Sequence, residues 1–252
     1  MEKPVTLPQI FPAGSVRLIA GIFWMILAAA VMLTLLILLL PQQIFLAISN
    51  YLQILTALGG AAAIGFLHFR YGHRSVLPYA AGAFALWGIS NIAWYVNVAL
   101  GLRAQVFPGL IDMGIIASIL VLMVAYQNGL KRKPCSRQLL TGLLVLFLII
   151  PVGILFTSGF TGTTLVTFLY FFACGSLIIT ALSRGLTERP FLLAGTVLFA
   201  VAFMIYPVRE MFFSTNSLLS VIGTFVVAGL ALMVLGFIGL SMETLDAGPR
   251  SG

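Results

Sequence analysis

The sequence predicts an all-α protein, a polytopic bundle of eight membrane-spanning helices with both termini in the cytoplasm. Of its 252 residues, 61% are hydrophobic and only 8% are charged, whereas a soluble domain carries roughly 25% charged residues. The apolar runs are continuous and do not alternate at every second residue, which favours helices over a membrane barrel. This composition argues against a soluble enzyme, a nucleic-acid-binding domain, a disordered chain and a disulfide scaffold.

Each predicted span has the roughly 20 mostly apolar residues that a helix needs to cross a bilayer. Several spans begin or end at proline, as helices commonly do: Pro41 follows the first, Pro78 opens the third, Pro108 opens the fourth and Pro190 opens the seventh. The first apolar run is longer than the about 7–15 residues of a cleavable signal, so we expect it to be retained. The expected spans are 16–40, 44–68, 77–101, 109–129, 138–157, 163–183, 190–213 and 217–241.

The residues outside the spans are too few to form a second domain. Residues 1–15 contain three prolines and are expected to lie extended at the membrane surface, and residues 242–252 form a short tail. We therefore expect a single integral membrane domain over 1–252, with the bundle at 16–241.

Basic residues predict the orientation of the bundle, because cytoplasmic loops are enriched in lysine and arginine. Of the 13 basic residues, 11 fall on one side of the predicted membrane, and only Arg103 and Arg209 fall on the other. This asymmetry predicts cytoplasmic termini and a location in the cell membrane. The 11 are Lys3, Arg17, Arg70, Arg74, Lys131, Arg132, Lys133, Arg137, Arg184, Arg189 and Arg250.

Ionisable side chains at membrane depth are costly and are functional candidates by default. Asp112 lies 19 residues before Lys131, or ~29 Å along a helix, which places it at the outer end of the fourth span. By the same argument Arg209 and Glu210 lie at the outer end of the seventh span, close to Tyr206, and Pro207 is expected to kink that helix.

The third span carries a polar and aromatic stripe that rises toward the same face. At 100° per residue, Trp87, Asn91 and Trp94 fall within an arc of about 120°. The convergence of these groups predicts an outward-facing ligand pocket. Its expected lining is Trp87, Asn91, Trp94, Asp112, Tyr206, Arg209 and Glu210.

Five of these residues also have a structural interpretation. Trp94 is of a type that anchors helices at the membrane interface, and Asn91 could form a hydrogen bond between helices. Asp112 would be favoured at the positive end of its helix dipole. Arg209 and Glu210 could be an ion pair at the edge of a loop.

No catalytic, metal or cofactor site is predicted. All three lysines are cytoplasmic, which argues against a retinal Schiff base, and His68 and His73 lie at the cytoplasmic end of the second span, which argues against haem ligands. The sequence contains no HExxH motif and no set of residues arranged as nucleophile and base. Cys135 and Cys174 are expected at different depths, so we predict no disulfide.

Two short motifs give a resemblance to a known family. The pattern Asn91-x-x-Trp94-Tyr95, followed by Phe107-Pro108-x-x-x-Asp112, resembles the multi-pass membrane sensory region at the N-terminus of many archaeal and bacterial histidine kinases and diguanylate cyclases. The resemblance covers about 50 residues, from the third span to the fourth. It departs from the family at the start of the last span, where an acidic residue is common and this chain has Asn216 and Ser217. Because no output domain follows before Gly252, the resemblance implies a stand-alone module.

Three functions remain open from the sequence. The first is a sensory or ligand-binding module that takes up a small or amphipathic ligand and signals through a membrane or cytoplasmic partner protein. The second is an accessory subunit of a membrane complex, and the third is a small-molecule transporter, which the apolar inner halves of the spans disfavour. The lipid bilayer is an expected partner in every case, and no nucleic-acid partner is expected. In the second case, docking faces would include Gly59, Gly60, Gly229, Gly236 and Gly239.

Overall fold

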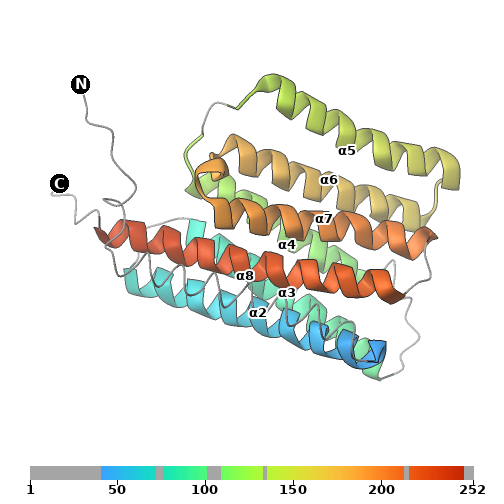
Figure 1. Cartoon of the computed structure of the whole chain (residues 1–252), viewed down its shortest axis with the longest axis horizontal. Helices are drawn as coiled ribbons and strands as arrows, with labels where there is room; N and C mark the ends of the chain where they lie inside the picture. The colour runs from blue at the N-terminus through green and yellow to red at the C-terminus, as the bar shows by residue number, and fades with distance from the viewer. Residues whose placement is uncertain (1–40, 72–75, 101–108, 133–134, 213–215, 247–252) are drawn as a thin grey trace. The chain divides into compact units, whose positions relative to one another are not determined.

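The computed structural model describes residues 41–71, 76–100, 109–132, 135–212 and 216–246. Within these ranges the chain forms seven long helices and no strand (Figure 1). All seven are long and apolar enough to cross a membrane, so the chain is a multi-pass membrane protein of the all-helical class. The helices are α2 Gln42–Tyr71, α3 Val76–Ala99, α4 Leu110–Gly129, α5 Arg137–Ser158, α6 Gly162–Ser183, α7 Pro190–Phe212 and α8 Asn216–Asp246, with a short 3₁₀ helix, η2 Leu186–Glu188, before α7.

The helix ends follow the expected spans to within three residues, except that α8 continues five residues past residue 241. Pro190 is the first residue of α7, as predicted, because proline has no N–H to lose in a first helical turn. The helix runs on through Pro207 to Phe212. The expected span at 16–40 and the loop with Arg103 lie outside the described residues.

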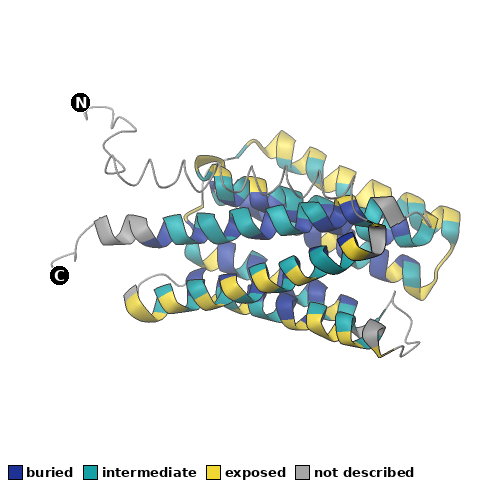
Figure 2. Ribbon diagram, turned by 60° about the horizontal axis from the view of Figure 1, so that its bottom comes forward, coloured by how far each residue is buried: buried dark blue, intermediate teal, exposed yellow. Residues whose placement is uncertain are grey.

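Six of the helices close a ring. In the order of their contacts these are α2, α3, α4, α6, α7 and α8, and α8 packs in turn against α2. Helix α5 lies outside the ring and packs mainly against α6, as Figure 1 shows. Most residues of α5 are exposed or half-buried, in contrast to the dark blue interior of the ring in Figure 2. The apolar surface of α5 is therefore positioned to contact lipid.

Helices α7 and α8 approach each other closely at two glycines. A Cβ atom added to Gly229 would lie 2.9 Å from the carbonyl oxygen of Gly195 and 2.9 Å from the backbone nitrogen of Phe199. Real Cβ atoms do not approach backbone this closely, so the two helices can meet here only because neither residue has a side chain.

The glycines expected to form docking faces divide into two groups. Added Cβ atoms at Gly60, Gly229 and Gly236 would collide with residues of neighbouring helices in the ring, so these three glycines pack inside the protein. Only Gly59 and Gly239 have no described atom within 4 Å of an added Cβ. The expectation of a docking face is therefore wrong for the first three, because the ring closes over them.

Candidate functional site

The carboxylate of Asp112 is buried where α4 begins and α7 ends, which we call the Asp112 end of the bundle. Its side chain is only 2% exposed. The backbone N–H of Gly109 donates to Oδ2 at 2.7 Å, and the hydroxyl of Tyr170 donates to Oδ1 at 2.9 Å. Both carboxylate oxygens therefore have a donor, one from the start of the same helix and one from α6.

The bond from Gly109 agrees with the structural interpretation of Asp112. An acidic side chain in the first turn of a helix accepts from otherwise unpaired N–H groups and interacts favourably with the helix dipole. That interpretation does not account for the bond from Tyr170. This second bond joins α4 to its neighbour in the ring, α6.

Helix α7 completes the polar cluster. The ring of Tyr206 meets that of Tyr170 edge to face, with centroids 6.0 Å apart, and the phenol interacts electrostatically with the carboxylates of Asp112 and Glu210. Arg209 forms an ion pair with Glu210. We call these five residues, Asp112, Tyr170, Tyr206, Arg209 and Glu210, the Asp112 cluster.

The Asp112 cluster is closed on its inner side and partly open at its rim. The side chains of Arg209 and Glu210 are 11% and 22% exposed, whereas Asp112 and Tyr170 are buried. Glu210 pairs with the guanidinium of Arg209, the carboxylate of Asp112 is bonded by Tyr170, and the two phenols supply hydroxyl groups and aromatic faces. Such a set can bind a ligand through charge, hydrogen bonds and ring contacts together.

The three predicted residues of α3 have different surroundings. Trp87 is 1% exposed and packs edge to face against Phe199 and Phe203 of α7, with centroids 6.1 and 6.3 Å away. The amide of Asn91 donates to the carbonyl oxygen of Trp87 in its own helix at 3.1 Å. Trp94 is half-buried. Among the described residues, Asn91 thus bonds within α3 and forms no bond to another helix.

Aromatic packing nevertheless connects Trp87 to the Asp112 cluster. The ring of Phe203 stacks on that of Tyr170 with centroids 5.9 Å apart and an interplanar angle of 6°. Phe203 therefore contacts both the deep tryptophan and the phenol that bonds Asp112. The structure connects Asp112 to Tyr206 through Tyr170, pairs Arg209 with Glu210 in the same turn of α7, and joins Trp87 to Tyr170 through the ring of Phe203.

Tyr170 was absent from the expected lining, although it is the residue that bonds Asp112. It lies within the apolar run 168–175 of α6, so neither charge nor polar periodicity identifies it as a site residue. Its residue type does indicate a polar neighbour, because a buried tyrosine hydroxyl usually has a hydrogen-bond partner.

A second buried polar pair lies nearer the opposite end of the bundle, where α4 ends, which we call the Lys131 end. The hydroxyls of Tyr126 and Thr196 are 2.6 Å apart, and both residues are fully buried. Either hydroxyl can be the donor in this pair, because Thr196 also has the carbonyl oxygen of Leu192 as an acceptor at 2.6 Å and Tyr126 has the sulfur of Met233 at 3.7 Å. This pair joins α4 to α7 without any charge.

Among the described residues, no group of three or more His, Cys, Asp or Glu side chains could hold a metal ion. Cys135 is half-buried, Cys174 is buried in α6, and neither forms a disulfide. No protein-family model, curated protein or solved structure matches the chain.

Proposed function

We propose that the protein is a sensory or ligand-binding module of the cell membrane, with the Asp112 cluster as its outward-facing site. The observation that carries the proposal is the hydrogen bond from Tyr170 to the buried carboxylate of Asp112. Removing a carboxylate from water is costly in a membrane protein, and such groups are typically kept for function. Glu210 and Arg209 on α7 provide the partly exposed rim through which a ligand would reach it.

A ligand would bind by competing for the hydrogen bonds and charges of this cluster. The faces of Tyr170 and Tyr206 supply contact area, while Glu210 and Arg209 orient a polar or charged group. Because the cluster joins α4, α6 and α7, occupancy would change how these three helices are held together. Pro207, buried within α7, leaves one backbone carbonyl of that helix without its usual donor and so gives it a place to bend. Asn91 and Trp94 of α3 remain predicted wall residues of the site.

The resemblance of the third and fourth spans to membrane sensory regions supports a signalling role over simple storage of a ligand. In this proposal, movement of α7 would pass to the basic segments at the Lys131 end. A partner protein there would receive the signal, in keeping with the cytoplasmic orientation predicted from the charge asymmetry.

The test is ligand-dependent thermal stabilisation of the purified protein. Panels of small organic cations, organic anions and neutral amphiphiles would be screened with wild-type protein, and each hit repeated with Asp112→Asn and Arg209→Gln. A ligand at 100 times its Kd stabilises by about 2.7 kcal/mol, and loss of one charged hydrogen bond costs about 1.5–3 kcal/mol. We therefore expect affinity to fall at least tenfold in both variants.

The matched control is Arg184→Gln, the same substitution at the opposite end of the bundle. Arg184 donates to the carbonyl oxygen of Leu130 at 3.1 Å and has no part in the Asp112 cluster. Its variant should keep the full ligand-dependent stabilisation. If Asp112→Asn and Arg209→Gln keep it as well, the ligand binds elsewhere and the proposed site is wrong.

A further inference from the structure

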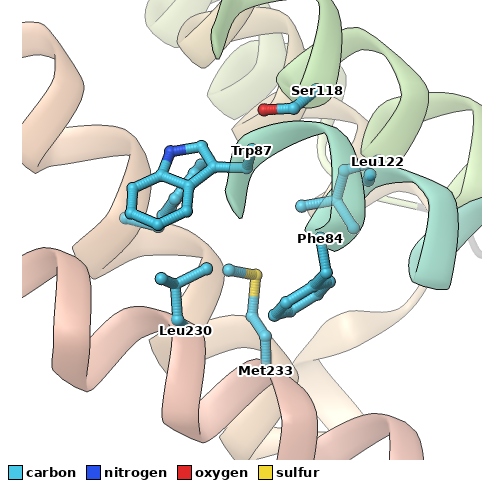
Figure 3. Close-up of a pocket in the computed structure, with 8 residues that line it drawn as sticks. Phe84, Trp87, Ser118, Leu122, Leu230 and Met233 are labelled. Atoms are coloured by element: carbon cyan, nitrogen blue, oxygen red, sulfur yellow. The ribbon is translucent and has the colours of Figure 1, made fainter. Parts of the chain in front are cut away.

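A small cavity lies inside the ring, between α3, α4, α7 and α8. Its volume is about 10 Å³, which is room for about one water molecule. Most of its wall is apolar, with Phe199, Leu230 and Met233 among the lining residues. Trp87 of α3 and Ser118 of α4 also line it, and each carries one polar group (Figure 3).

The indole nitrogen of Trp87 has no hydrogen-bond partner among the described residues. The residue is 1% exposed, and its Nε1 atom is buried and unpaired. This group can only donate. A buried donor without an acceptor is costly, and such groups in native proteins are usually satisfied by ordered water when no protein acceptor is near.

Ser118 offers the second polar contact. It is buried, and its hydroxyl donates to the carbonyl oxygen of Ile115 at 2.7 Å. The proton is thus used within α4, and the oxygen retains capacity to accept. Figure 3 shows this oxygen pointing toward the indole, on the side of the ring that carries the nitrogen.

We propose that one water molecule occupies this cavity and bridges Trp87 to Ser118. The water oxygen accepts from Nε1–H of Trp87, and one water hydrogen is donated to Oγ of Ser118. An entirely apolar cavity of this size would stay dry, but the residues that line this one include Trp87, with its unpaired indole nitrogen, and Ser118, with its hydroxyl. Two polar partners are the minimum that a buried water needs. The size excludes a larger ligand, so the site is separate from the Asp112 cluster and does not depend on its function.

The test is hydration NMR on the full-length protein in lipid nanodiscs, with ¹⁵N-labelled tryptophan indoles. The Trp87 signal is assigned by its loss in Trp87→Phe. In the wild type we expect a cross-peak between the Trp87 indole proton and water. In a rotating-frame Overhauser experiment this cross-peak should have the sign opposite to the diagonal, which indicates proximity to water and not chemical exchange with it. Its absence, or a cross-peak to lipid acyl chains in its place, would overturn the proposal without any variant at Ser118.

Two serine variants then test the bridge. Ser118→Ala removes the acceptor and should abolish the water cross-peak and move the indole proton upfield. Ser90→Ala is the matched control, because Ser90 is also buried and donates to a carbonyl oxygen of its own helix, that of Leu86 at 2.8 Å, but does not line the cavity. It should leave the signal unchanged. Equal spectra for Ser118→Ala and wild type would show that Ser118 does not hold the water.

Discussion

The hydrogen bond between Tyr170 and Asp112 can be measured by a double-mutant cycle, which isolates the pair from the cavities that each substitution creates. Tyr170→Phe removes only the hydroxyl that donates to Oδ1 at 2.9 Å. Asp112→Ala removes the acceptor. Tyr170 and Asp112 are both buried, so water cannot replace the lost partner without entering the ring.

The expected magnitude follows from the charge of the acceptor. Hydrogen bonds to charged groups contribute about 1.5–3 kcal/mol, whereas side-chain hydrogen bonds between membrane helices average about 0.6 kcal/mol. We expect a coupling free energy for the pair within the first range. It corresponds to roughly a 10- to 150-fold change in the unfolding equilibrium, since about 1.4 kcal/mol is tenfold. The assay is reversible unfolding in bicelles by steric trapping, on the four proteins of the cycle.

The pair of Tyr126 and Thr196 provides the matched control, measured with Tyr126→Phe and Thr196→Val. It also joins a buried tyrosine to a side chain on another helix, at 2.6 Å, but that partner is a neutral hydroxyl. Its coupling free energy should be near 0.6 kcal/mol. If the two cycles give equal values, Asp112 does not act as a charged acceptor, and the reasoning that makes it the centre of the site fails.

Two further predictions concern packing and orientation. Gly229→Ala should destabilise the protein by about 1–3 kcal/mol, because its Cβ would meet the backbone of α7. Gly239→Ala in the same helix is the control and should be neutral or stabilise by up to about 1 kcal/mol. Equal effects of the two substitutions in thermal unfolding would contradict the tight contact of α7 with α8. A membrane-impermeant maleimide should label the half-buried Cys135 in inverted vesicles and not in intact cells, with buried Cys174 unreactive on both sides. Loss of the label in Cys135→Ser is the control, and labelling of intact cells would reverse the predicted topology.

The sequence by itself determined the class of the protein and the course of most of its chain. A spanning helix must be continuous and apolar over a fixed length, so the seven described helices could be located from the order of residues alone. Proline marked the start of α7 because its effect on the backbone is local. The charge asymmetry also gave an orientation, which the maleimide experiment would test.

Only the tertiary structure decided which faces meet. It placed α5 outside the ring, enclosed Gly60, Gly229 and Gly236, put Trp87 in the core and gave Asp112 a partner in Tyr170. In a membrane both lipid-facing and protein-facing positions are apolar, so periodicity does not separate them as it does in water. The partner of a buried polar group therefore depends on which helices are neighbours, and that information is absent from any single span.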